Sequence, residues 1–108
     1  LRLATQTGKV GIWDWDIRSG TYYLSPRYHE MLDYSTEELA HRVDAFYAIV
    51  HPDDRAMVEK ALHDHFSKDR KPYHVEFRMR AKSGTYRWFR ATGQAVFDAS
   101  GTAYRMVG

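Results

Sequence analysis

The two ends of the chain alternate between apolar and polar positions, whereas the middle repeats with a helical period. Residues 9–17 alternate regularly enough to predict a strand that buries one face. Gly20 can supply a positive φ in the short turn that follows, and residues 21–24 are again β-prone. The first part of the chain therefore predicts an antiparallel hairpin.

The middle of the chain predicts several short helices. Its signals are polar N-cap residues, a proline in the first turn, and apolar side chains that recur at helical spacing. The expected segments are residues 25–33 with Ser25 as N-cap, one or two turns after a capping box of Ser35 and Glu38, a buried helix over residues 43–50, and the longest helix over residues 53–67, capped by Asp53 or Asp54.

After Pro72 the period returns to two. Strands are expected over residues 73–80, 85–97 and 102–107, with turns between them at Gly84 and Gly101. Two strands, several helices and three further strands favour an α+β domain, with the helices packed on one face of an antiparallel sheet.

Composition narrows the classes of function. The chain has 108 residues, which suits one domain, and its net charge of +2 is spread along the sequence without a basic patch for nucleic acid. The absence of cysteine excludes disulfides, thiolate metal sites and a cysteinyl flavin adduct. No apolar segment is long enough to cross a bilayer, so we expect this domain to make no membrane contact. We expect a cytoplasmic location, with a place in a membrane-anchored sensor as the alternative.

Short motifs follow one another along most of the chain. They are Gly11-Ile12-Trp13-Asp14-Trp15-Asp16, Ser25-Pro26-Arg27, Met31-Leu32-Asp33-Tyr34-Ser35, Val50-His51-Pro52-Asp53-Asp54-Arg55, Pro72-Tyr73, Glu76-Phe77-Arg78, Lys82-Ser83-Gly84, Arg87-Trp88, and Asp98 with Gly101. In this order they resemble a PAS domain of the subgroup that begins Gly-x-Trp-Asp-Trp-Asp and carries the PAC motif. Asp33 stands where this family usually has glycine, and aspartate tolerates the left-handed conformation moderately well.

The resemblance implies a five-stranded antiparallel sheet in the order 2-1-5-4-3. It also implies a non-enzymatic sensory or dimerisation module that detects a small molecule or mediates protein contacts. Such a module acts on an attached output domain, a histidine kinase or a cyclic-di-GMP enzyme. We expect residues 1–8 to be the end of a flanking helix or linker, residues 9–108 to form the domain, and the parent to be a signalling enzyme.

A candidate pocket lies between the inner face of the predicted sheet and the helices above it. Its candidate lining residues are Trp13, Trp15, Met31, Phe46, Tyr73, Phe77, Met79, Phe89, Tyr104 and Met106. Large side chains of this kind pack densely, so the expectation is a filled core without a cofactor, with a small organic ligand as the alternative.

The outer face of the sheet is a candidate protein interface. Its candidates are Ile12, Trp88, Arg90, Thr92 and Val96, because an exposed tryptophan with aliphatic neighbours on a sheet favours a protein contact. We expect a homodimer through this face and the N-terminal flank.

Three histidines have two interpretations each. The resemblance implies, as an alternative function, a haem-binding gas or redox sensor whose ligand is His63 or His65 on the longest predicted helix. The other interpretation of these two residues is a solvent-facing histidine that favours the helix C-terminus. His51 could act as a pH switch, although its motif favours a loop that ends in an N-cap.

Two carboxylate pairs, Asp53 with Asp54 and Asp14 with Asp16, suggest metal binding or acid–base chemistry, but helix capping and outward strand positions explain them more simply. Glu76 and Arg78 lie on one strand face, where opposite charges can form a cross-strand or diagonal pair, and the resemblance implies a structural rather than a catalytic ion pair. No nucleophile with a base partner and no phosphate-binding glycine loop occurs, so the domain itself is not expected to be an enzyme.

Overall fold

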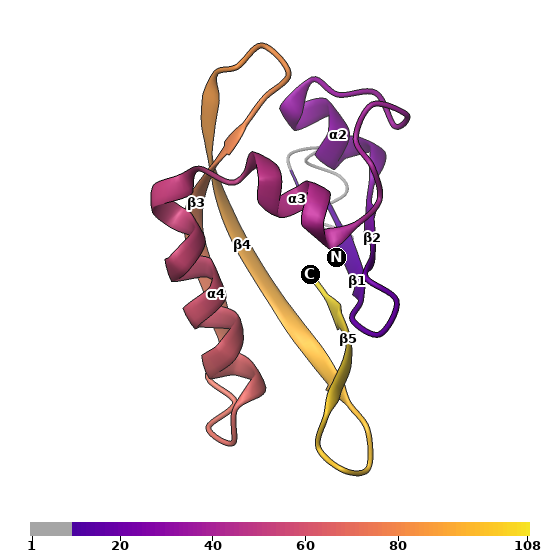
Figure 1. The fold of residues 1–108 in the computed structure, drawn as a ribbon, viewed down its shortest axis with the longest axis vertical. Helices are drawn as coiled ribbons and strands as arrows, with labels where there is room; N and C mark the ends of the chain where they lie inside the picture. Colours follow the sequence, from indigo (N-terminus) through magenta and orange to yellow (C-terminus); the bar gives the residue numbers. More distant parts are fainter. Residues whose placement is uncertain (1–9) are drawn as a thin grey trace.

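The computed structural model describes residues 10–108 and contains one five-stranded antiparallel sheet (Figure 1). The strands are β1 (Trp13–Asp16), β2 (Thr21–Leu24), β3 (Tyr73–Arg80), β4 (Tyr86–Phe97) and β5 (Ala103–Val107). Their spatial order is β2-β1-β5-β4-β3, which confirms the expected topology. The predicted flank over residues 1–8 lies outside the described residues.

Three helices pack on one side of this sheet, where α4 lies along β3 and α3 crosses between α4 and β2 (Figure 1). They are α2 (Pro26–Leu32), α3 (Val43–Ile49) and α4 (Pro52–Phe66), close to the predicted bounds. None of the helices within residues 10–108 is long and apolar enough to cross a membrane.

The segment after α2 forms turns rather than the expected helical turns. Only one half of the predicted side-chain capping box is present. Glu38 Oε1 accepts the backbone N–H of Ser35 at 2.8 Å, but the N–H of Glu38 donates to the Ser35 carbonyl at 3.1 Å rather than to the Ser35 hydroxyl. Glu38 is held from the other side by Lys82, and these two partners lower the pKa of its carboxyl to about 2. The loop is thus tied to the β3–β4 hairpin.

The start of α2 differs from the prediction in its cap. Ser25 occupies the N-cap position but makes no side-chain cap bond, since its Oγ accepts the backbone N–H of Ile12 at 2.8 Å. The hydroxyl therefore joins the start of α2 to the segment before β1. At the other end, Asp33 has a φ of 62°, which confirms the expected left-handed cap.

The β3–β4 hairpin holds the end of α2. Arg87 donates from one guanidinium nitrogen to the carbonyl of Met31 at 2.6 Å and from another to the Asp33 carboxylate at 2.7 Å. The backbone N–H of Lys82 donates to the carbonyl of Leu32 at 2.9 Å. These bonds satisfy carbonyls that the last turn of a helix leaves without partners.

The register between β4 and β5 shifts near one end of the pair. Val96 lies opposite Arg105 and Phe97 lies opposite Ala103, so Tyr104 is an extra, unpaired residue. This bulge breaks the period of two. The prediction that Tyr104 faces the helices is wrong: its ring contacts the guanidinium of Arg18 at 4.9 Å, on the outer side of the sheet.

The core lies between the sheet and the helices. Its most deeply buried side chains are Leu32, Val50, Val58, Phe77, Met79 and Met106. Trp13 packs against two positions without side chains, Gly93 and Gly108. A Cβ atom on Gly93 would lie 2.6 Å from the Trp13 ring, so this position requires glycine on steric grounds alone.

Candidate functional site

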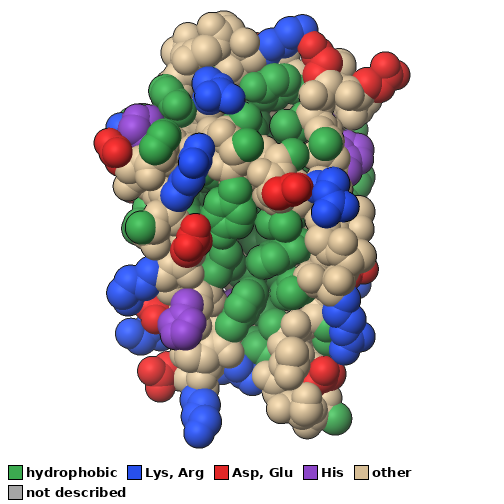
Figure 2. Space-filling model, in the orientation of Figure 1, with side chains coloured by type: hydrophobic (Ala, Val, Ile, Leu, Met, Phe, Trp, Pro, Cys, Tyr) green, Lys and Arg blue, Asp and Glu red, His purple; other side chains and the backbone are tan. Residues whose placement is uncertain are grey.

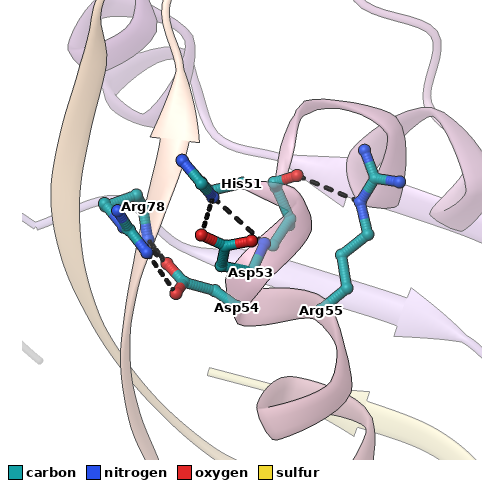
Figure 3. Close-up of polar contacts among 6 residues, drawn as sticks. His51, Asp53, Asp54, Arg55 and Arg78 are labelled. Atoms are coloured by element: carbon teal, nitrogen blue, oxygen red, sulfur yellow. Dashed lines mark hydrogen bonds and ion pairs between the residues drawn. The ribbon is translucent and has the colours of Figure 1, made fainter.

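The motif from His51 to Arg55 joins the end of α3, the start of α4 and strand β3 (Figure 3). His51 Nδ1 accepts the backbone N–H of Asp53 at 3.1 Å and so caps α4, while the imidazole packs 4.6 Å from the ring of Tyr86. Arg55 Nε donates to the carbonyl of Val50 at 3.1 Å. The predicted loop with an N-cap is confirmed, but His51 rather than an aspartate makes the capping bond.

Asp54 crosses from α4 to β3, where it pairs with Arg78 (Figure 3). One carboxylate oxygen accepts the backbone N–H of Arg78 at 2.8 Å and its Nε at 3.0 Å, and the other accepts a terminal guanidinium nitrogen at 2.8 Å. The Arg78 side chain thereby lowers the pKa of Asp54 to about 2, against a smaller opposing effect of burial.

The remaining carboxylates also have structural partners. Asp14 pairs with Arg105 across β1 and β5, and Asp16 accepts the backbone N–H of Ser19 in the following turn. Glu76 pairs with Arg90 at 3.2 Å, so Arg78 and Glu76 belong to different ion pairs. These contacts support structural roles for the acidic residues that the sequence singled out.

A small apolar cavity lies between β1, β2, α3, α4 and β3. Its volume is about 20 Å³, which is room for about one water molecule. It is lined by Trp13, Trp15, Tyr22, Val43, Phe46, Tyr47, Val58, Leu62 and Tyr73. The indole N–H of Trp15 is buried and makes no hydrogen bond within the described residues. The aromatic side chains thus nearly fill the space.

Four tyrosines in or near the core are neutral groups, and three of them, Tyr22, Tyr47 and Tyr73, line this cavity. Burial raises the pKa of Tyr22, Tyr28 and Tyr73, and it raises the pKa of Tyr47 to about 12. The Tyr28 hydroxyl donates to the sulfur of Met79 at 3.3 Å. At neutral pH these phenols therefore present hydrogen-bond donors without charge.

The predicted lining residues fall into four groups. Trp13, Trp15, Phe46 and Tyr73 line the cavity; Met31 and Phe89 line an open groove of about 550 Å³ between α2 and β4; Phe77, Met79 and Met106 are buried in the core; and Tyr104 lies on the other side of the sheet. Tyr22 and Tyr47 were missed, although the alternation of Tyr22 with Leu24 marks it as inward-facing. Figure 2 shows hydrophobic side chains gathered along the middle of the helix-bearing face.

The structure does not place either candidate haem ligand suitably. His65 is buried, and both of its nitrogens are engaged: Nδ1 lies 2.7 Å from the carbonyl of Lys71 and Nε2 accepts the N–H of Ala95 at 3.0 Å. His63 is exposed on α4. The simpler interpretation also needs correction, because His65 is a structural core residue rather than a solvent-facing one.

The outer sheet face presents the predicted interface residues. Trp88 is 69% exposed, Ile12 is 38% exposed and Val96 is 37% exposed, and Arg90 and Thr92 are exposed as well. The guanidinium of Arg78 lies 5.2 Å from the Trp88 ring centroid. This face therefore combines a large exposed aromatic ring with flanking charges, the composition typical of a contact surface.

The sheet order, the helices on one face and the nearly filled aromatic cavity between the two layers define a small α+β domain. Residues 21–108 match the model of the family described as PAS fold. The chain belongs to this family.

Similar proteins are known from signalling systems. The chain is 29% identical, over its whole length, to the probable diguanylate cyclase DgcE of Escherichia coli K12, of which it spans 10%. It is 30% identical over 92% of its length to the sensor protein FixL of Bradyrhizobium diazoefficiens, of which it spans 19%. A solved sensory box histidine kinase/response regulator from Burkholderia thailandensis matches 99% of this chain and 79% of its own, with 40% identity and a TM-score of 0.85.

Proposed function

We propose that this domain is a sensory and dimerisation module that acts on an attached output domain. The curated relatives support this proposal, because the chain spans only a tenth and a fifth of them and their names describe a cyclase and a sensor. On the same grounds the parent protein is a signalling enzyme of bacterial type, a histidine kinase or a cyclic-di-GMP enzyme.

The exposed ring of Trp88 is the observation that favours a protein contact as the main function of the domain. A tryptophan that is 69% exposed on a flat strand face is costly in water unless a partner covers it. Ile12 and Val96 are further exposed apolar side chains of the domain, while Arg90 and Glu76 form an exposed ion pair beside Trp88. We assign this face to a homodimer contact.

Analytical ultracentrifugation of the domain tests this assignment. We expect a dimer whose dissociation constant rises at least ~10-fold in Trp88→Ala, since buried tryptophans dominate interface energies. Met57→Ala removes an apolar side chain, 40% exposed, from the helix side and serves as the matched control. A domain that stays monomeric at the highest attainable concentration, or a dimer indifferent to Trp88→Ala, would contradict the proposal.

Detection of a small molecule in the cavity is the second candidate. The buried indole N–H of Trp15 lacks an acceptor within the described residues, and a ligand with a carbonyl or ether oxygen would supply one. The cavity of about 20 Å³ must expand to admit it.

Native mass spectrometry of the purified domain, with its absorption spectrum, tests this candidate. A bound mass that is lost in Trp15→Phe, which keeps an aromatic ring but removes the donor, supports it. An unliganded spectrum for the wild type under the same conditions argues against it.

A further inference from the structure

His29 is the least satisfied polar side chain among the described residues. It lies on α2 and is 2% exposed, and within residues 10–108 neither Nδ1 nor Nε2 makes a hydrogen bond of good geometry, although the backbone of Ser35 lies near the ring. A buried imidazole without partners costs free energy, and such groups in folded proteins usually have an ion, water or ligand beside them. His65, by contrast, engages both of its nitrogens.

A second imidazole lies beside it. The ring centroid of His41 is 5.5 Å from that of His29, and the two planes are inclined by 57°. His41 is exposed, and its backbone is anchored because its carbonyl accepts the N–H of Tyr22 at 2.9 Å. The two rings therefore come from different segments, α2 and the loop before α3, and each segment is fixed independently to the sheet.

The spacing of the rings suits one shared metal ion. An ion about 2.0–2.1 Å from one nitrogen of each imidazole lies roughly 3.2 Å from each ring centroid. Two centroids 5.5 Å apart then subtend an angle of roughly 120° at the ion, close to the tetrahedral value that zinc prefers.

Two imidazoles alone leave coordination positions open. A metal ion is coordinated by the neutral form of each ring. No group of three or more His, Cys, Asp or Glu side chains within residues 10–108 could hold a metal, so the other ligands would be water molecules. A site of this kind selects ions that favour imidazole, such as Zn²⁺, over Mg²⁺ or Ca²⁺.

We propose that His29 and His41 form a two-imidazole binding site for a divalent transition metal ion. The ion joins α2 to the loop before α3, and this inference is independent of the homodimer and of the aromatic cavity.

Isothermal titration calorimetry with ZnCl₂ on the untagged domain at neutral pH tests the proposal. We expect one ion per chain in the wild type and an affinity at least ~10-fold weaker in His41→Ala, since even outer contacts of a metal site are worth 10–100-fold. His63→Ala removes an exposed histidine from α4 and is the matched control, expected to bind Zn²⁺ like the wild type.

Imidazole NMR signals provide a second measurement that does not depend on a variant of the buried ring. Zn²⁺ is expected to shift the ring signals of His29 and His41 together and to leave those of His65 unchanged. Equal affinities for His41→Ala and His63→Ala, no measurable binding by the wild type, or shifts at His41 without His29 would overturn the two-imidazole site.

Discussion

His65 accepts the backbone N–H of Ala95 through Nε2 at 3.0 Å, at a point where β4 continues beyond the end of β3. The first residue of β3, Tyr73, pairs with Gly93, so Ala95 has no strand partner on that edge. Nδ1 of the same ring lies 2.7 Å from the carbonyl of Lys71. The neutral imidazole, with its proton on Nδ1, thus takes the place of one backbone hydrogen bond that a neighbouring strand would make.

Replacing His65 with phenylalanine is expected to lower the free energy of unfolding by about 2–4 kcal/mol, because it leaves the buried N–H of Ala95 and the partly buried carbonyl of Lys71 without partners. His63→Ala, two residues away and exposed, should change it by less than about 0.5 kcal/mol. Urea unfolding followed by tryptophan fluorescence measures both. Equal values for the two variants would show that the buried bonds carry no net stability.

The Asp54–Arg78 pair predicts acid sensitivity. The pKa of Asp54 is about 2 in the folded protein and lies near its ordinary value of 3.8 in the unfolded chain. The ionised carboxylate is therefore favoured by folding, and its contribution is present above about pH 4 and lost as the pH falls toward about 2.

Asp54→Asn is expected to destabilise the domain by roughly 2 kcal/mol at pH 7. This difference from the wild type should shrink steadily as the pH is lowered from 4 towards 2. Asp53→Asn, with its side chain 80% exposed, is the control and should change stability by less than about 0.5 kcal/mol at pH 7. Denaturant titrations at several pH values measure the effect, and a gap for Asp54→Asn that does not depend on pH would refute the argument.

The contact between Trp13 and Gly93 predicts a coupled pair of substitutions. Gly93→Ala places a Cβ 2.6 Å from the Trp13 ring and is expected to cost about 1–3 kcal/mol. Trp13→Phe removes the ring atoms that clash, so Gly93→Ala should cost less in that background. A double-mutant cycle of thermal unfolding measures the coupling, and additive effects would mean that the ring does not constrain this glycine.

The bulge at Tyr104 predicts that substitutions are tolerated at this position, although strict alternation of inward and outward residues would place it in the core. Tyr104→Ser is expected to cost about 1 kcal/mol or less, because the ring lies on the outer side against Arg18. Met106→Ala, in the core two residues later, should cost about 2–5 kcal/mol. Chemical denaturation distinguishes the two positions, and comparable costs would place Tyr104 inside.

Local sequence signals predicted the helices and strands well, because each element is short and is bounded by residues that favour a turn or a helix start. Gly20, Pro26 and Gly101 stand where the structure turns or starts a helix, and Gly20 and Gly101 have positive φ. The bulge was not predictable in this way, since Tyr104 becomes an extra residue only when β4 and β5 pair across the hairpin. Ser25 shows the same limit, because its competing partner Ile12 is distant in sequence.

The site was predicted less completely than the fold. Alternation identified which strand side chains point inward, but not which of them meet the cavity and which are covered by other core residues. The sequence pattern did not single out His29, because a polar side chain does not mark the buried face of a helix, although His29 lies next to Tyr28 and three residues before Leu32, on the buried side of α2. A helical wheel centred on those two residues includes it.

Arg87 and Trp88 are consecutive residues of β4, and together they couple the two faces of the sheet through the strand backbone. The first holds the carbonyl end of α2, and the second stands on the opposite face, open to a partner. A shift of the strand that reorients the tryptophan must also displace the guanidinium that anchors the helix. A contact made or lost on one face can therefore act on the opposite face through a single peptide bond. No intervening side chains are required to transmit the change.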